Sequence, residues 1–296
     1  MPREIEVKSI LNKTKRRDHW FLDDYTINMY SSCSYNCLYC YIRGSKYGIN
    51  LEDSLSAKVN GIEILERQLF NRAKKEQYGY IVLSSATEPY LKAEAEYKLT
   101  RQALELILKY RFPVHIITKS CLVERDFDLL LKINRTACIP NDLQSKIDQG
   151  TLLTFSFSTL DDEIGKIFER GAPSPTERLK TVKKSLGVGL YTGVSMMPLL
   201  PYISDTTESL HQMFGSFQKV GAKYVMPATI TLFGNGKADS KTLILKTIEK
   251  HFPDLIPKYQ KFFSHSDQMP AYYQKAFYEK MKELSAEYGI ADRIIT

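Results

Sequence analysis

The chain has 296 residues, of which 43% are hydrophobic and 25% charged, a balance that is typical of a globular protein and excludes a disordered or membrane-embedded chain. Its 41 basic and 34 acidic residues leave a formal net charge of +7, which permits a polyanionic partner without requiring one. The odd number of five cysteines argues against a disulfide framework, and the charged amino terminus lacks the apolar segment of a secretory signal. We therefore expect a cytoplasmic protein in a reducing compartment.

The first 24 residues are expected to form a basic amino-terminal arm. Its basic run and the two rings that follow are Lys13, Lys15, Arg16, Arg17, His19 and Trp20. Such a run is either solvated or in contact with a phosphate backbone. The arm therefore does not by itself identify a nucleic-acid partner.

Residues 25–235 alternate between strand and helix patterns. Strands are predicted at residues 25–30, 80–84, 114–118, 152–158, 190–196 and 224–229. Helices are predicted at residues 55–75, 95–110, 124–133, 161–169, 175–186 and 206–220. Six strands that alternate with helices specify parallel β-α units joined by right-handed crossovers. The pattern predicts an α/β fold, either a partial barrel or an open sheet.

Residues 236–296 are predicted to form a carboxyl-terminal helical extension that is rich in aromatic side chains. These are Phe252, Tyr259, Phe262, Phe263, Tyr272, Tyr273, Phe277 and Tyr278. Aromatic residues at helical spacing usually belong to a core, so we expect a helical cap rather than a surface that stacks on a substrate. The irregular residues 134–150 carry no pattern that indicates a role.

Three cysteines lie close together just after the first strand of this region. Cys33, Cys37 and Cys40 follow the spacing C-x3-C-x2-C, with Tyr39 directly before the last of them. Thiolates are the usual ligands of iron–sulfur clusters, and three of them leave a four-iron cubane one ligand short. The alternatives are a zinc site, which usually needs a second cysteine pair that this chain lacks, and a set of buried structural cysteines. We expect the cluster, with one iron open to a small molecule.

Polar side chains follow several of the predicted strands. They occupy residues 84–88, residues 118–120, Ser156 and Ser158, and they are joined by Pro198 and Pro201 after the fifth strand. In parallel α/β folds the functional end is the carboxyl edge of the strands. We therefore expect these groups to converge on one mouth.

The cysteine motif, with its aromatic residue before the last cysteine, resembles the signature of the radical S-adenosylmethionine (SAM) enzymes. From about residue 25 to residue 205 the chain also resembles the spore photoproduct lyase-like, or DNA repair photolyase-like, branch of that family. The segments that carry this resemblance are CSYNCLYCY, SSATEPY with EYKLTR, IITKSCLVERDFDLL, FSFSTLDDE with FERGAPSPTERL, and MMPLLPYISD. It implies a partial (β/α)6 TIM-like barrel, a [4Fe-4S] cluster on the three cysteines, and cleavage of SAM to methionine and a 5′-deoxyadenosyl radical.

The same resemblance implies which residues bind SAM. Tyr39 and Tyr41 would line the adenine side of the site. Glu88 would accept a hydrogen bond from the methionyl amine, while Lys119 and Ser156 would hold the carboxylate. These assignments predict a SAM site assembled from four different segments of the chain.

One departure from the family pattern concerns the return of a hydrogen atom to the substrate. Spore photoproduct lyases carry a cysteine in the loop after the second strand, and here Ser85 stands at the matching position. A serine O–H bond is too strong for a comparable donation of a hydrogen atom. This route would therefore need Cys121 or a tyrosine as the donor instead. An isolated cysteine such as Cys121 is, however, usually a small buried residue. Arg170, in the segment FERG, is a weaker candidate for the SAM site.

The sequence therefore predicts a lyase-like radical SAM enzyme whose 5′-deoxyadenosyl radical abstracts hydrogen from a substrate. A nucleic-acid base of DNA or RNA is the first hypothesis for that substrate. Modification of a peptide or small metabolite is the alternative, and a non-catalytic metal-binding or nucleic-acid-binding module ranks below both. An electron donor of the flavodoxin or ferredoxin type would reduce the cluster, and no membrane partner is expected.

Overall fold

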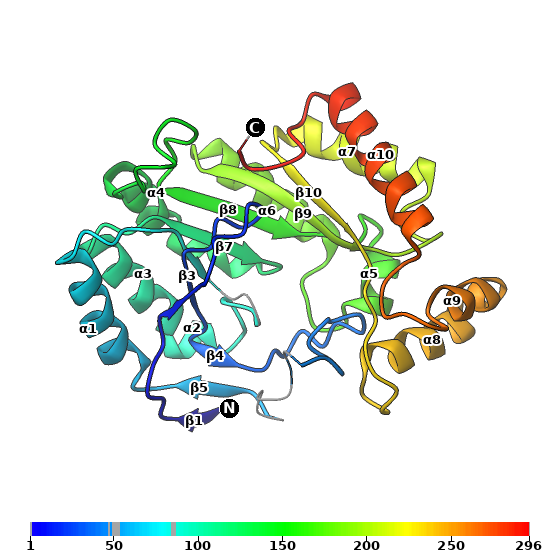
Figure 1. Cartoon of the computed structure of the whole chain (residues 1–296), viewed down its shortest axis with the longest axis horizontal. Coiled ribbons are helices and arrows are strands. Elements are labelled where there is room, and N and C mark those ends of the chain that lie inside the picture. The colour runs from blue at the N-terminus through cyan, green and yellow to red at the C-terminus, as the bar shows by residue number, and fades with distance from the viewer. Residues whose placement is uncertain (1, 47, 49–53, 84–86, 296) are drawn as a thin grey trace.

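The computed structural model of the chain describes residues 2–46, 48, 54–83 and 87–295 (Figure 1). Within them, six parallel strands pair in chain order, and a short antiparallel strand extends one edge. The six are β3 (Tyr25–Ile27), β6 (Ile81–Leu83), β7 (Val114–Thr118), β8 (Thr151–Ser156), β9 (Tyr191–Leu199) and β10 (Val225–Thr229), and the edge strand is β2 (Asn12–Lys13). Because β2 and β10 form the two edges, the curved sheet is a partial barrel that is open between them. The predicted α/β class is confirmed, and the structure favours the partial barrel over the open sheet.

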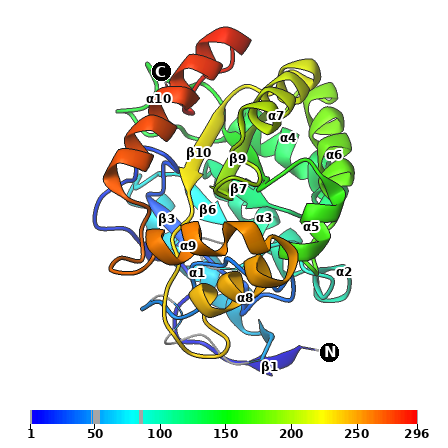
Figure 2. The same ribbon diagram turned by 90° about the vertical axis from the view of Figure 1, so that its right-hand side faces the viewer.

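Helices cover the outer side of this sheet (Figure 2). They are α1 (Gly61–Ala73), α3 (Leu99–Lys109), α4 (Phe127–Thr136), α6 (Pro175–Gly187) and α7 (Thr207–Val220). The start of α6 shows how the local sequence sets a boundary: the Ser174 hydroxyl accepts a hydrogen bond from the Glu177 amide, and the Glu177 carboxylate accepts one from the Ser174 amide. Pro175 follows at the first helical position, where a missing N–H removes no helical hydrogen bond.

The structure corrects the strand predicted at residues 25–30. That segment divides between two sheets, because β3 ends at Ile27 and β4 (Tyr30–Ser31) pairs with β5 (Ser56–Lys58). Strand β1 (Arg3–Ile5) pairs with the other side of β5 and completes this small sheet of described residues. The second sheet lies below the partial barrel in Figure 1 and connects the amino terminus to the segment before the cysteines.

Three predicted helices also differ from the structure at their starts. The helix predicted from residue 55 begins at Gly61, because residues 56–58 form strand β5. The helix predicted at residues 95–110 is two helices, α2 (Glu94–Tyr97) and α3, because Lys98 between them has a left-handed φ of 53°. The helix predicted from residue 124 begins earlier as the 3-10 turn η1 (Cys121–Asp126), which continues into α4.

The carboxyl-terminal segment forms helices that pack on the barrel. They are α8 (Ser240–His251), the turn η2 (Pro253–Leu255), α9 (Ile256–Phe262) and α10 (Ala271–Tyr288). Tyr259 and Phe263 are buried in a core that they share with Leu38 and Tyr39 of the cysteine loop. Helix α10 packs against α7 and β10, while Tyr272 is 67% exposed. The packing supports a helical cap, and the boundaries at residues 24 and 235 remain predictions.

The amino-terminal segment is ordered against the rest of the chain. Ile10, Leu11 and Leu22 are buried. The Arg17 guanidinium donates a hydrogen bond of 2.8 Å to Asp24 and also pairs with Asp142, so carboxylates compensate its charge. As for membranes, no helix in the described part of the chain combines the length and the apolar character that crossing a bilayer requires.

Gly193 in β9 lies against the ring of Tyr224, where an added Cβ would come within 2.3 Å of a ring carbon. We expect Gly193→Ala to lower the free energy of unfolding by about 1–3 kcal/mol, because the crowded core must shift. Urea unfolding followed by circular dichroism measures this change. Gly187→Ala at the end of α6, where nothing lies within 4 Å, is the control and should change the free energy by less than about 1 kcal/mol. Equal stability of the two variants would contradict the packing argument.

Candidate active site

A cavity of about 450 Å³ lies at the carboxyl end of the barrel strands. Its walls come from the cysteine loop, defined here as residues 32–41, and from the ends of β7, β8 and β9. The lining includes all three clustered cysteines and the five predicted SAM-binding residues: Cys33, Cys37, Cys40, Tyr39, Tyr41, Glu88, Lys119 and Ser156. The structure therefore brings these residues together around one space. Of the other groups expected at this mouth, Thr87, Thr118 and Pro198 also line the cavity, whereas Ser120, Ser158 and Pro201 do not, and residues 84–86 lie outside the described residues.

The cysteine loop presents three half-buried thiols to this cavity. Burial raises the pKa of the Cys33 and Cys37 thiols to about 12, so a cation must displace their protons before they act as ligands. Among the described residues, no three His, Cys, Asp or Glu groups are placed to hold a single metal ion. A four-iron cluster takes its thiolates on different irons, and three thiols on one cavity wall fit that donor set.

Glu88 is buried and already accepts three hydrogen bonds from the protein. Its Oε1 accepts from the Tyr90 amide at 3.0 Å and from the Thr118 hydroxyl, and its Oε2 accepts from the Lys119 amide at 2.9 Å. Burial raises the pKa of Glu88 in spite of these contacts. Because a carboxylate has about four acceptor positions, Oε2 can take one further donor from the cavity.

Lys119 and Ser156 come from neighbouring strands. Lys119 directly follows β7, and Ser156 is the last residue of β8, so both lie at the carboxyl edge. The Lys119 Nζ lies 5.8 Å from the centre of the Tyr39 ring and 3.9 Å from Glu169 Oε1. An ammonium and a hydroxyl in this position can bind a carboxylate group of a ligand.

The two tyrosines of the loop are placed differently. Tyr39 is buried, and its hydroxyl donates a hydrogen bond to Glu169. Burial is the main cause that raises the pKa of Tyr39, so its phenol stays protonated. Tyr41 is 41% exposed and also lines this cavity.

Three further residues considered from the sequence are not part of the described cavity lining. Cys121 begins η1, and its thiol interacts with Thr181 of α6, while burial raises the pKa of that thiol. Arg170 is exposed to solvent. Ser85 lies outside the described residues. The structure thus places Cys121 against α6 and outside the described lining of the cavity that the three clustered cysteines share.

Glu169 and Arg178 were not singled out from the sequence, yet they form a buried ion pair beside the cavity. Their side chains are 1% and 0% exposed. Burial raises the pKa of Glu169, but the charges of Arg178 and Lys119 outweigh it, so the pKa of this carboxyl is lowered overall. Both residues belong to the segment FERGAPSPTERL, which carries part of the family resemblance. That resemblance was the one signal in the sequence that could have pointed to them, because the periodicity of the segment does not indicate that the two side chains pair.

A hydrogen-bonded row of side chains inside the barrel ends at Phe21, a residue of the cavity lining. His115 Nδ1 lies 2.8 Å from the carbonyl of Phe21, which lines the cavity, and Nε2 lies 2.7 Å from the Thr154 hydroxyl. The Thr154 and Tyr224 hydroxyls are also 2.7 Å apart. Burial lowers the pKa of His115 to about 4. The imidazole is therefore neutral, with its proton on Nδ1, because the carbonyl can only accept.

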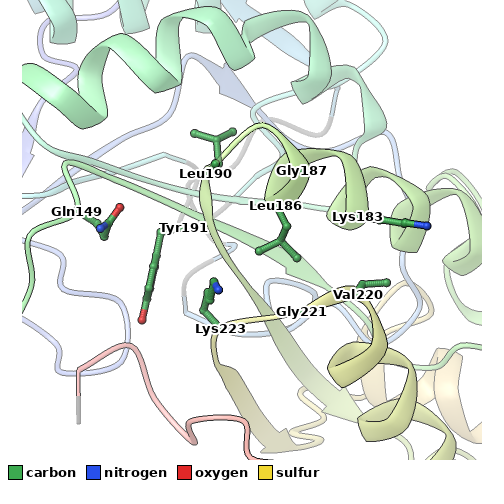
Figure 3. A pocket seen from close by; sticks show the side chains of 10 residues that line it. Gln149, Lys183, Leu186, Gly187, Leu190, Tyr191, Val220, Gly221 and Lys223 are labelled. Carbon is green, nitrogen blue, oxygen red and sulfur yellow. The ribbon is translucent and has the colours of Figure 1, made fainter.

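A second hollow, of about 620 Å³, lies at the opposite end of the strands (Figure 3). It is lined by Tyr191 at the start of β9, by Lys223 before β10, and by Lys183 of α6. Both lysines are exposed. Because the functional groups of parallel α/β folds gather at the carboxyl edge, we place the active site in the cavity with the cysteines.

The chain matches a family model described as the radical SAM superfamily over residues 27–214. This span is well over half of the chain and contains the three clustered cysteines, the SAM-binding candidates and the Glu169–Arg178 pair. The chain belongs to the radical SAM superfamily. Membership indicates an enzyme and implies a [4Fe-4S] cluster and SAM as its cofactors.

Similar proteins include both curated relatives and solved structures. An uncharacterized protein of Mycobacterium tuberculosis is 25% identical over 295 residues, covering 97% of this chain and 81% of the relative. A radical SAM Nalpha-GlyT isomerase of Pseudomonas phage M6 is 24% identical over 194 residues, covering 66% of this chain and 36% of the isomerase. A spore photoproduct lyase double mutant with bound AdoMet and dinucleoside spore photoproduct has a TM-score of 0.63 at 14% identity, covering 99% of this chain and 81% of the lyase. This match confirms the expected fold.

The buried neutral imidazole of His115 makes the fold sensitive to acid. The unfolded chain binds this proton near pH 6.5, whereas the folded chain binds it only near pH 4, so stability is lost as the pH falls through this window. From about pH 7.5 to about pH 5 we expect the wild type to lose about 2 kcal/mol more unfolding free energy than His115→Gln. Urea unfolding at both pH values measures the difference. The same pH dependence in both proteins would contradict a neutral buried histidine.

Proposed function

We propose that Cys33, Cys37 and Cys40 hold a [4Fe-4S] cluster and that the adjoining cavity binds SAM. When bound, this cluster supplies the electron for reductive cleavage of SAM to methionine and a 5′-deoxyadenosyl radical, which abstracts hydrogen from a substrate. One observation carries the proposal: three thiols share a cavity with Glu88 and Lys119, a carboxylate and an ammonium suited to the two charged groups of a methionyl moiety.

In this proposal the polar residues of the cavity bind and orient the methionyl part of SAM. Glu88 accepts a hydrogen bond from the amine at its remaining acceptor position. Lys119 and Ser156 bind the carboxylate from the neighbouring strand ends. Because these groups come from different strands of one rigid barrel, the ligand is held in a single orientation, which favours reaction with a nearby substrate hydrogen.

Other residues of the cavity provide an apolar environment. Tyr39 and Tyr41 line the adenine side in the proposed site, where their rings present flat faces. The apolar side chains of Val82, Ile117 and Met197 also line the cavity. Together they exclude water from the space in which a reactive intermediate would form.

We propose a nucleic-acid base as the substrate and a lyase-like reaction. The net charge of +7 and the fold shared with a lyase whose solved complex contains dinucleoside spore photoproduct support this choice. Radical SAM enzymes need a reductant, and we propose one of the flavodoxin or ferredoxin type. An oxygen-sensitive cluster suits the reducing cytoplasm, which is the proposed location.

Anaerobic reconstitution with iron and sulfide tests the radical chemistry. After reduction with dithionite in the presence of SAM, we expect 5′-deoxyadenosine in the wild type, measured by liquid chromatography and mass spectrometry. Cys37→Ala removes one proposed cluster ligand and should reduce this product to background. Cys138→Ala, which changes a cysteine outside the described cavity lining, is the matched control and should keep the product. Absence of product from a reconstituted, reduced wild type would refute the proposed function.

Binding to single-stranded DNA and RNA tests the proposed substrate class. Fluorescence anisotropy with labelled oligonucleotides should show binding whose affinity falls linearly with salt on a double logarithmic scale, because basic side chains displace counterions from phosphates. A neutral peptide of similar size is the control and should show no such dependence. If neither nucleic acid binds while 5′-deoxyadenosine is still formed, the substrate is instead a peptide or a small metabolite.

A further inference from the structure

The turn after α5 (Asp162–Phe168) lies directly against the cysteine loop. The Phe168 carbonyl accepts a hydrogen bond from the Leu38 amide at 2.9 Å, and the Gly171 amide donates one to the Tyr35 carbonyl at 2.9 Å. A Cβ added at Gly171 would lie 2.5 Å from the Ser34 carbonyl oxygen, so only glycine allows this approach. Residues 168–171 therefore hold the backbone of the loop that carries the cysteines.

Glu169, in the middle of this turn, connects the loop to the barrel. Its Oε1 accepts hydrogen bonds from the Tyr39 hydroxyl and, at 2.9 Å, from the Ser158 hydroxyl, and it lies 3.9 Å from the Lys119 Nζ. Its Oε2 accepts from Arg178. The carboxylate thus contacts side chains from the cysteine loop, from just after β7, from just after β8 and from α6.

Arg178 completes the link to the proposed SAM site. It is fully buried, and besides Glu169 it donates a hydrogen bond of 2.5 Å to the Ser156 carbonyl. Its guanidinium also lies 5.1 Å from the centre of the Phe157 ring. The arginine is therefore fixed to the end of β8, and it fixes Glu169 in turn.

The charges of Glu169, Arg178 and Lys119 explain how Lys119 can bind a ligand in the cavity. Glu169 carries one negative charge, and the closer partner, Arg178, compensates it. The ammonium of Lys119 lies 3.9 Å from Glu169 Oε1, which is too far for a hydrogen bond. Among the described residues none accepts a hydrogen bond from this ammonium, so it can donate to a ligand in the cavity that it lines, and the centre of the Tyr39 ring lies 5.8 Å from it on another side.

We infer that Glu169 and Arg178 are positioning residues, which aim Lys119 and Tyr39 at the methionyl and adenine parts of SAM. This inference rests on the proposed function, because it assigns Lys119 the carboxylate of SAM. A purely structural ion pair would stabilise the fold without changing what Lys119 contributes to binding.

The test measures how much Lys119→Met weakens SAM binding in the wild type and in a variant that lacks the Glu169–Arg178 pair. SAM binding to the reconstituted, unreduced protein is measured by equilibrium dialysis, so that no turnover is needed. In the wild type we expect Lys119→Met to weaken binding roughly 10- to 100-fold, the loss of one charged hydrogen bond. In the double variant Glu169→Gln/Arg178→Met, which removes both charges of the fully buried pair together, the same substitution should weaken binding less than about threefold.

Two single variants extend the test in case the double variant does not fold. Ser158→Ala removes one hydrogen bond to Glu169, although Ser158 stands outside the described cavity lining. We expect it to weaken SAM binding about threefold, because Glu169 then loses one of the contacts that orient it. Glu163→Gln is the control, because it changes an exposed glutamate of α5, the helix that precedes the turn. Glu163 pairs with Lys166 at 2.6 Å, and the variant should leave SAM affinity unchanged.

The outcomes separate this inference from the proposed function. If Lys119→Met weakens SAM binding equally in the wild type and in the double variant, the pair is structural only and the inference fails. If the double variant does not fold, the single variants decide. The inference then fails if Ser158→Ala binds SAM as tightly as Glu163→Gln. If the wild type binds SAM but forms no 5′-deoxyadenosine, the proposed function fails, and the affinities still decide the inference. If the wild type binds no SAM, both fail.

Discussion

The parallel pairing of the barrel strands in chain order is the constraint on which the rest of this structure depends. Because the six strands from β3 to β10 run in the same direction, the described residues that follow β6, β7 and β8, and the end of β9, all lie at one edge. The cysteine loop, which follows β4 of the small sheet, reaches the same edge. Residues as far apart in the chain as Cys33 and Pro198 therefore line one cavity.

Buried charge is the second constraint, and it follows from the first. Glu88 and Glu169 are almost fully removed from solvent, where an unpaired carboxylate would be strongly unfavourable. Each receives its partners from several elements: Glu88 binds groups at residues 90, 118 and 119, and Glu169 binds groups from the loop, the barrel and α6. Of the two carboxylates, Glu169 ties the cysteine loop to the strand ends through Tyr39 and Ser158, and so the position of the thiols depends on the packing of the barrel.

Much of the fold could be predicted because its signals are local. The alternation of strands and helices appears in hydrophobic periodicity, and β7 has the predicted bounds of residues 114–118. The missed strands β1, β2 and β5 have only two or three residues each, too few for a periodic pattern. The break between α2 and α3 at Lys98 was missed because no glycine or proline marks its left-handed backbone.

The sequence by itself determined the α/β class and the three clustered thiols, because periodicity and cysteine spacing are properties of neighbouring residues. Only the tertiary structure decided which polar groups share the cavity. It placed Glu169, rather than the exposed Arg170, against Tyr39 and Lys119, and it placed Cys121 against α6. These contacts join residues far apart in the chain, and they exist only once the strands have packed side by side and the helices have covered them.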